Sequence, residues 1–213
     1  MLTRIRVQYE YFNYKETSES AAAKKFQDLE PLSRGMHGYS LLRPALNNEY
    51  FHDLYDSCAS FGIPIEGALL IRYRARGSSA NRVRIQGHHT ETGPGVYESA
   101  LAYQPVLRMA DNATLFKYIA KLTGMKYGVM PTFMAKPYSD QPGCSGHVHI
   151  SLRDQSGENI FAVKESEVKD GRPGASSEDT KRISLIAEYF LAGVLMGLPS
   201  IVSLLRWAYF SPC

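Results

Sequence analysis

The chain has 213 residues, 44% of them hydrophobic and 21% charged, as is usual for a globular protein that buries a sizeable core. No apolar run comes near the roughly 20 residues that span a bilayer, and the N-terminus lacks the apolar core of a signal peptide, so we expect a cytoplasmic protein with no membrane partner. The three cysteines are far apart in the chain and indicate neither a disulfide framework nor a cysteine-pair metal knuckle.

Charge is distributed unevenly along the chain. The formal net charge is +3, but five arginines lie in residues 68–87, a segment without acidic residues. Without that segment the net charge would be −2. The basicity therefore belongs to one segment, and we expect no nucleic-acid partner for the chain as a whole.

The first predicted element is a β-strand. Residues 4–14 alternate in polarity and are rich in aromatic and β-branched side chains. A period of two puts Gln8 and Glu10 on one face and Tyr9 and Tyr11 on the other. Two polar side chains thus share a face of this strand.

A helix is predicted from Asn48 onward, because apolar residues recur there with helical spacing. Asn47 or Asn48 is the expected N-cap, and Gly62 is the expected terminator. The residues that give this spacing are Phe51, Leu54, Tyr55 and Cys58.

A second helix is predicted over Asn112–Leu122, with Asp111 as its N-cap and Gly124 as its end. A short strand is expected within residues 129–134. The helix residues expected to face inward are Leu115, Ile119 and Leu122.

Residues 147–152 alternate again and predict another strand. Residues 153–180 are polar and contain Gly, Pro and Ser, which is typical of a surface excursion. Ser176 and Asp179 then resemble a capping box for a helix through about Leu195. One face of the predicted strand is expected to hold His147, His149 and Ser151.

Glu91 and Glu98 are the first candidates for chemistry. On one continuous strand their odd spacing would put them on opposite faces, but the Gly-Pro-Gly at 93–95 can reverse the chain and bring both carboxylates from paired strands into one cavity. Such oxygen ligands suit Mg²⁺ or Mn²⁺. Taken alone, the pair is more typical of solvated strand residues.

His147 and His149 are the second candidates. Alone, a His-x-His on a strand is more typical of a hydrogen-bonded structural pair than of metal ligands. The preceding loop, residues 142–146, contains glycines that let the backbone approach a small ligand closely.

Taken together and in order, these segments resemble the catalytic domain of glutamine synthetase, especially its type-I-like fungal branch. The resemblance runs from about Val7 to about Pro199. The segments that carry it are the opening strand, HHTETGPGVYE at 88–98, FKY at 116–118, PTFMAKP at 131–137 and GCSGHVHISL at 143–152.

The resemblance implies an α+β fold, in which a curved antiparallel sheet forms a partial barrel with helices on its outer face. It also implies two Mg²⁺ or Mn²⁺ sites. Glu10, Glu91 and Glu98 match the ligands of the first metal, and His147 matches a ligand of the second. The family has a further glutamate where this chain has Gln8, and a neutral amide is a weaker ligand, so the second site is expected to be weak.

The implied reaction is ATP-dependent amidation of glutamate, with ammonia or a larger amine, by way of γ-glutamyl phosphate. Gly143 matches the loop glycine whose backbone meets the substrate glutamate. His149 and Ser151 match positions that face ATP. The resemblance further implies a homo-oligomer with active sites between subunits.

Residues 68–87 interrupt the resemblance. If they are removed, Glu66 falls five residues before Glu91, where the family has a glutamate that contacts ATP; with them, Gln86 takes that place. We interpret the segment as a translated intron, with a real surface loop, or less readily a nucleic-acid-binding loop, as the alternatives.

Residues 1–213 are thus expected to form a partial catalytic domain with a divergent tail at 200–213. The family's N-terminal β-grasp domain and its catalytic arginines have no counterpart in this sequence, so we expect the polypeptide by itself to be inactive. The alternative is a non-catalytic relative with a structural or binding role.

Overall fold

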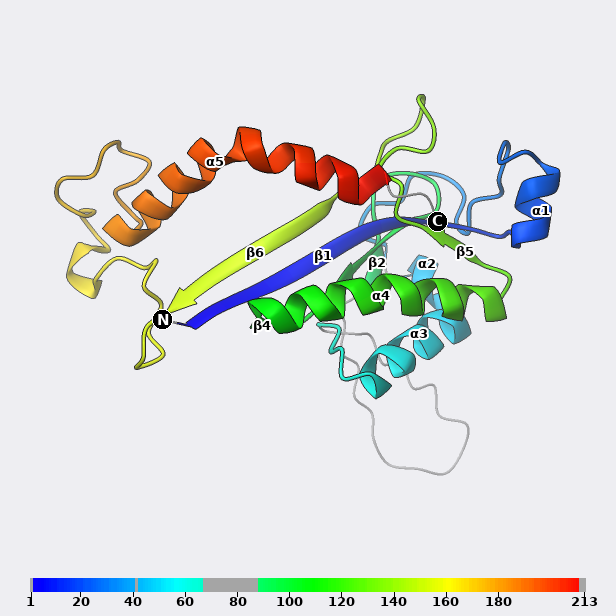
Figure 1. Ribbon diagram of the computed structural model, residues 1–213, viewed down its shortest axis with the longest axis horizontal. Coiled ribbons are helices and arrows are strands. Elements are labelled where there is room, and N and C mark those ends of the chain that lie inside the picture. The colour runs from blue at the N-terminus through cyan, green and yellow to red at the C-terminus, as the bar shows by residue number, and fades with distance from the viewer. Residues whose placement is uncertain (1, 41, 67–87, 211–213) are drawn as a thin grey trace. The chain divides into compact units, whose positions relative to one another are not determined.

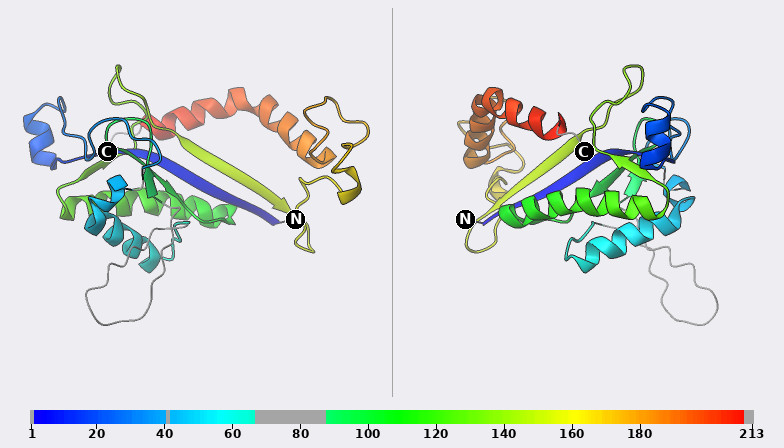
Figure 2. Two further views of the ribbon diagram at one scale, coloured as in Figure 1. Left: turned by 180° about the vertical axis from the view of Figure 1, so that it is seen from behind. Right: turned by 45° about the vertical axis from the view of Figure 1, so that its right-hand side comes forward.

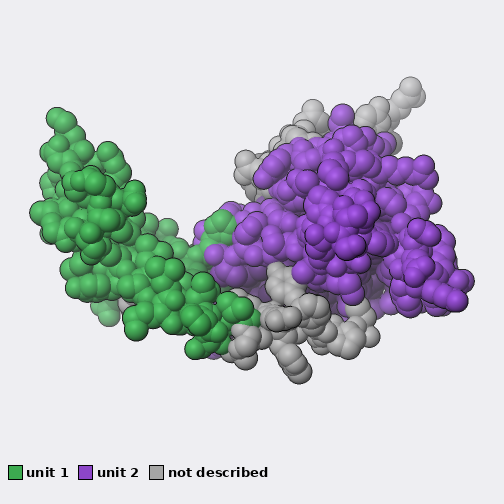
Figure 3. Space-filling model, turned by 90° about the horizontal axis from the view of Figure 1, so that it is seen from above, with its two compact units in different colours: residues 1–5, 149–213 green, residues 6–148 purple. Residues whose placement is uncertain are grey.

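The computed structural model describes residues 2–40, 42–66 and 88–210. The chain divides into two compact units, one of residues 6–148 and one of residues 1–5 with 149–213 (Figure 3). The arginine-rich segment 68–87, and Gln86 with it, lies outside the described residues.

A six-stranded sheet is organised around the long first strand. Its strands are β1 (Leu2–Tyr14), β2 (His88–Thr90), β3 (Val96–Ala100), β4 (Gln104–Pro105), β5 (Met130–Thr132) and β6 (Gly146–Arg153). The order is β2-β3-β1-β4, and β5 and β6 also pair with β1. The pairings of β1 with β3, β1 with β5 and β2 with β3 are antiparallel, which agrees with the predicted α+β class.

Two helices, α3 (Asn48–Ser60) and α4 (Val106–Lys126), lie on one face of β1 and β3 (Figures 1 and 2). Phe116 of α4 stacks on Tyr9, with ring centroids 5.9 Å apart. Phe51 of α3 lies 4.8 Å from the ring of Tyr97 in β3. The face of β1 that carries Tyr9 and Tyr11 therefore packs against α4, and the face that carries Glu10 points the other way.

The helix predicted from Asn48 is confirmed. Phe51, Leu54 and Cys58 are buried, and the chain leaves the helix at Gly62 with a φ of +69°, a conformation that favours glycine. Two short helices precede it, α1 (Ser18–Ala23) and α2 (Leu42–Ala45).

The bounds predicted for the second helix are wrong at both ends. α4 begins at Val106, six residues before the predicted start, and its N-cap is Pro105 rather than Asp111. Gly124 lies inside the helix, where a Cβ would come within 2.5 Å of the Val129 carbonyl oxygen. That glycine is therefore required by a close approach of the backbone and does not end the helix.

The inward face of α4 was also only partly predicted. Ile119 is buried as expected, but Leu122 is 43% exposed, because the face that packs against β1 centres on Phe116. The buried residues of the helix are Met109, Asn112, Ala113, Phe116, Ile119, Ala120, Thr123 and Gly124.

The polar stretch after β6 forms turns, an isolated 3-10 turn η1 (Glu165–Glu167) and then the long helix α5 (Leu185–Phe210). The predicted capping box at Ser176 is wrong. Instead, Ser184 Oγ accepts a hydrogen bond from Ala187 N at 3.1 Å, three residues into the helix. Ser176 N and Thr180 Oγ1 both donate to Glu188, so their polar groups fasten the turns to the first turn of α5.

α5 is more apolar than was expected from the sequence. Its stretch Leu185–Val202 has a mean hydropathy of 1.8 and is long and apolar enough, by length and composition only, to cross a membrane. The expectation that no apolar run comes near that length is therefore wrong. The carboxylate of Glu188 interrupts the run in the sequence, but a single charge near the start of a helix leaves the rest of its surface apolar.

Candidate metal centre

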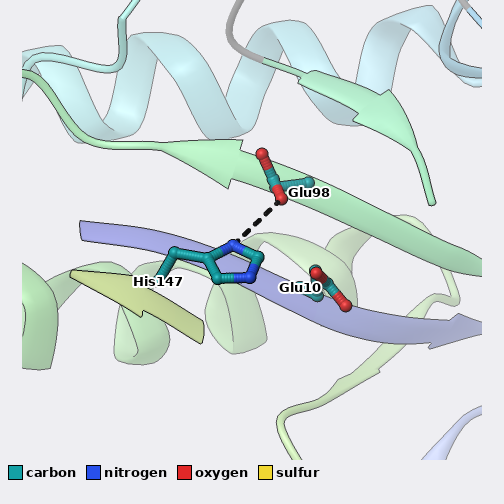
Figure 4. Close-up of side chains that lie close together, drawn as sticks. All are labelled: Glu10, Glu98 and His147. Carbon is teal, nitrogen blue, oxygen red and sulfur yellow. Dashed lines mark ion pairs between the residues drawn. The ribbon is translucent and has the colours of Figure 1, made fainter. Parts of the chain in front are cut away.

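Three ionisable side chains form one row across β1, β3 and β2. In the antiparallel register Glu10 lies directly opposite Glu98, and Glu98 lies directly opposite His89. Directly paired residues of neighbouring strands point to the same face of a sheet. Figure 4 shows Glu10 and Glu98 on adjacent strands with the ring of His147 directed at Glu98.

Glu98 is the centre of this cluster, and only 5% of it is exposed. Its carboxylate accepts a hydrogen bond from Gln8 Nε2 at 2.8 Å, and it lies 3.5 Å from His89 Nε2 and 3.9 Å from His147 Nδ1. Burial by itself would raise the pKa of Glu98, but His89, His147 and Gln8 outweigh burial and hold the pKa below its usual value. Glu98 is therefore an ionised carboxylate at neutral pH.

Glu91 follows β2 directly, and the tight turn after it leads the chain back along β3 to Glu98. One ligand atom each of His89, Glu91 and Glu98 lies within 4.8 Å of the others. The turn requires Gly95, because its φ is +73° and a Cβ there would lie 2.6 Å from the Asn13 carbonyl oxygen. The structure thus brings Glu91 and Glu98 together across the predicted Gly-Pro-Gly reversal.

Glu91 is the carboxylate of the cluster whose negative charge is disfavoured. Burial raises the pKa of Glu91, the carboxylates of Glu98 and Glu10 raise it further, and His89 opposes them. Contact with Glu98 in turn raises the pKa of His89. Groups that share a site with like charges bind a proton or a cation more readily, so this cluster favours a positively charged ligand.

Glu10 is oriented by the loop that precedes β6. Its carboxylate accepts hydrogen bonds from Ser145 N and Ser145 Oγ, each at 3.0 Å. Gly143 lies two residues earlier, at a point where a Cβ would be 2.6 Å from the Ala135 carbonyl oxygen. The close packing of Gly143 on Ala135 therefore sets the path of the loop whose Ser145 holds Glu10.

His147 completes a second group of ligand atoms. One atom each of Glu10, Glu98 and His147 lies within 4.8 Å of the others, and Glu98 belongs to both groups. Carboxylate oxygens suit Mg²⁺ and Mn²⁺, and imidazole nitrogens suit transition-metal ions. Glu98 is a buried ionised carboxylate, and Glu91 beside it has a charge that burial disfavours. A divalent cation would stabilise this arrangement, so the residues present fit such an ion.

The remaining predicted site residues are not brought into these groups. Glu66 forms an ion pair with Arg6 at 2.6 Å, and its backbone N–H donates to Ala100. His149 and Ser151 lie in the part of β6 that belongs to the other compact unit. Their assignment to ATP stays a prediction.

Two residues near the cluster were not predicted from the sequence. His89 lies between Glu91 and Glu98, and the ring of Tyr39 lies 5.1 Å from the His89 ring. Tyr39 has a φ of +58° and is held at the edge of β2 by a hydrogen bond from its N–H to Thr90 O. The alternation that was applied to His147 and His149 also puts His89 and Glu91 on one face, whereas nothing in the sequence marks Tyr39.

The fold and the cluster define a class of protein in which an antiparallel sheet carries carboxylates and histidines that fit a divalent cation. The chain matches the family described as "Glutamine synthetase, catalytic domain" over residues 4–208, a range that includes most of α5. The chain therefore belongs to the glutamine synthetase family, as was expected from the sequence.

Among relatives, the chain is 38% identical over 194 residues to "Type-1 glutamine synthetase 2" of Dictyostelium discoideum, covering 91% of this chain and 31% of that protein. It is 29% identical over 188 residues to "Glutamate--isopropylamine ligase" of Pseudomonas sp, covering 88% and 34%. The chain thus spans about a third of the length of these relatives.

Solved structures agree on the fold. A "novel glutamine synthase homolog" superposes with a TM-score of 0.63 at 16% identity, covering 94% of this chain and 36% of that one. The glutamine synthetase of Plasmodium falciparum gives a TM-score of 0.62 at 16% identity, covering 92% and 36%. The fold is that of the glutamine synthetase catalytic domain.

Proposed function

We propose that this chain carries the cation-binding part of an active site for ATP-dependent amidation of glutamate, with γ-glutamyl phosphate as the intermediate. The observation that carries the proposal is the row formed by Glu10, Glu98 and His89, joined by Glu91 and His147. The family assignment supports it, because relatives of this chain include a glutamine synthetase and a glutamate–isopropylamine ligase.

Each residue of the cluster has its own part in the proposal. Glu98 supplies a carboxylate that stays ionised, Glu10 supplies one whose orientation Ser145 fixes, and His147 supplies a nitrogen donor. A bound Mg²⁺ or Mn²⁺ would neutralise phosphate oxygens of ATP, which is the main catalytic demand in phosphoryl transfer. Glu91, whose charge is disfavoured in the free protein, would gain most from that positive charge.

ATP and glutamate are proposed to bind next to the cation. Gly143 is proposed to present its backbone to glutamate, and Glu66, His149 and Ser151 are proposed to contact ATP. These four roles are supported by the order of segments in this sequence, which matches the order in the family. Two cations are proposed. The site next to Gln8 is proposed to bind its cation less tightly, because the Gln8 amide is neutral and already donates to Glu98.

The amine is proposed to be ammonia, with a larger amine as the second candidate. The names of the two relatives support both, since one is a glutamine synthetase and the other a glutamate–isopropylamine ligase. Phosphate release from ATP in the presence of glutamate, compared between ammonium and isopropylamine, distinguishes the two. The same assay tests the expectation that this polypeptide by itself is inactive.

The cation site is tested separately from turnover. Titration of the 213-residue chain with Mn²⁺, followed by the loss of the electron paramagnetic resonance signal of free Mn²⁺, measures the dissociation constant. Glu98→Gln should weaken binding by at least about 100-fold, because it removes the charge shared by both ligand groups. Glu49→Gln, an exposed site on α3, is the control and should bind as the parent does.

Each outcome of these two assays has a meaning. Binding without any glutamate-dependent phosphate release would agree with the expectation that this polypeptide by itself is inactive, and clear glutamate-dependent phosphate release would contradict both that expectation and the alternative of a non-catalytic relative. A parent chain that does not bind Mn²⁺, or a Glu98→Gln variant that binds it equally well, would contradict the proposed cation site.

A further inference from the structure

A second hydrogen-bond chain crosses the same three strands on the buried face of the sheet. Tyr11 OH lies 2.9 Å from Ser99 Oγ, and Ser99 Oγ lies 2.7 Å from His88 Nδ1. The three residues come from β1, β3 and β2, and they are 0%, 0% and 7% exposed. Each side chain is thus held by a buried polar contact, which in a low-dielectric interior is costly to lose.

This chain lies directly behind the ionisable row. Neighbouring residues of a strand point to opposite faces but share one backbone, so a bond that fixes the strand on one face also fixes the side chain on the other. Every member of the buried chain is the sequence neighbour of a member of the row. The pairs are Tyr11 with Glu10, Ser99 with Glu98, and His88 with His89.

The row needs such support. Glu10 and Glu98 are directly opposed carboxylates, and like charges in that position push neighbouring strands or their side chains apart. β2 is only three residues long, so few backbone hydrogen bonds hold it against β3. The contact between Ser99 and His88 adds a side-chain link between those strands, and the contact between Ser99 and Tyr11 adds one to β1.

We propose that Tyr11, Ser99 and His88 are positioning residues of the cation site, whose hydrogen-bond chain holds β1, β3 and β2 at the spacing that brings each ligand group around Glu98 together. This inference rests on the proposed function, because it takes the row to be a cation site. None of the three touches the cation. Groups that orient metal ligands from behind typically change metal affinity by about 10- to 100-fold when they are removed.

The test uses Mn²⁺ binding to the whole chain, with thermal unfolding measured on every variant. Ser99→Ala and Tyr11→Phe each break the chain with little change in shape, and we expect each to weaken Mn²⁺ binding by about tenfold and to broaden the spectrum of the bound ion. Ser99→Thr keeps the hydroxyl and should restore affinity and spectrum. Tyr50→Phe is the matched control, because Tyr50 OH donates a buried hydrogen bond of 3.0 Å to Asn13, away from the row.

The Tyr50→Phe control separates an effect on the position of the ligands from an effect on the stability of the whole protein. Tyr50→Phe should lower the melting temperature about as much as Tyr11→Phe and leave Mn²⁺ binding unchanged. If Ser99→Ala and Tyr11→Phe fold and bind Mn²⁺ as the parent does, while Glu98→Gln does not, the positioning role is wrong and the cation site stands. If Tyr50→Phe loses affinity equally, the effect is general destabilisation and the inference is overturned. If the parent does not bind Mn²⁺, both the proposed function and this inference fall.

Discussion

Glu10 of β1 and Glu98 of β3 lie directly opposite each other in an antiparallel pair, and Glu98 is almost completely buried. Two carboxylates in this position repel, and such a pair costs the free protein roughly 0.2–1 kcal/mol. The hydrogen bonds from Ser145 and Gln8 offset part of that repulsion. A cation bound by both carboxylates would remove the rest of the repulsion. The contact that destabilises the free protein therefore favours cation binding.

Glu10→Gln should separate these two effects. In the absence of divalent ions the variant should melt at or slightly above the temperature of the parent, because it removes one of two opposed charges. With Mn²⁺ at about 100 times its dissociation constant, the parent should gain about 2.7 kcal/mol of stability, and the variant should gain almost none. Differential scanning fluorimetry with and without Mn²⁺ measures both. A variant that keeps the full gain would show that Glu10 is not a ligand.

Gly95→Ala should damage the site through the turn between Glu91 and Glu98. The substitution places a Cβ 2.6 Å from the Asn13 carbonyl oxygen at a φ of +73°, so the turn must move. We expect Mn²⁺ affinity to fall by at least about tenfold. Gly128→Ala is the matched control, since Gly128 has a φ of +62° and a Cβ added there would meet nothing within 4 Å.

Both glycine variants should lose about 1 kcal/mol of stability from the left-handed backbone alone. Only Gly95→Ala should also lose Mn²⁺ affinity, measured by titration at a temperature where both variants are folded. Equal affinity in the two variants would show that the turn does not set the position of Glu91.

Glu16 gives a prediction for pH. Hydrogen bonds from Lys24 Nζ, Ser20 Oγ and the Glu30 N–H lower the pKa of this buried carboxyl to about 2. Because the folded pKa is below the unfolded value of about 4.3, the carboxylate contributes stability that is complete above about pH 4.3 and is lost as the pH falls toward 2. Glu16→Gln should cost about 2 kcal/mol at pH 7, typical of hydrogen bonds to a charged group, and almost nothing at pH 2.

Urea unfolding of the parent and of Glu16→Gln at pH 7, 4, 3 and 2 measures that difference. The two stability curves should converge between about pH 4.3 and pH 2. Glu49→Gln, on the exposed surface of α3, should run parallel to the parent throughout. Curves of parent and Glu16→Gln that stay equally far apart down to pH 2 would contradict the assigned pKa.

Phe116→Ala tests the core that supports the sheet. Phe116 is fully buried and its ring contacts Tyr9, Tyr11 and Phe133, so its removal should cost about 3–5 kcal/mol in urea unfolding. Tyr118→Ala on the outer side of the same helix, at a residue 61% exposed, should cost less than about 1 kcal/mol. Similar losses at the two positions would mean that α4 does not pack on β1 through Phe116.

The sequence predicted local features well where a short-range pattern decides them. Alternation in β1 correctly separated Glu10 from Tyr11, and helical spacing identified α3 with its buried Phe51. The prediction failed where a close approach of the backbone decides. Gly124 looked like a helix end, but it is a glycine because the Val129 backbone packs against it.

The candidate metal centre was also predicted in part, where local patterns of the sequence place its residues. Alternation and the Gly-Pro-Gly turn predicted that Glu91 and Glu98 come together, and the family resemblance added Glu10 and His147. His89 was missed, although alternation puts it on the same face as Glu91; only the register of β2 against β3 decides that it lies opposite Glu98. Tyr39 was missed because a loop distant in sequence brings it to β2 through Thr90.

The sequence by itself determined the family and the face of each strand on which an acidic or histidine side chain lies, because side-chain alternation follows from the backbone alone. Only the tertiary structure decided that Glu10, Glu98 and His89 form one row backed by a buried hydrogen-bond chain. The reason is register: pairing between strands is non-local, and a slip of one residue would send every ligand of a strand to the opposite face.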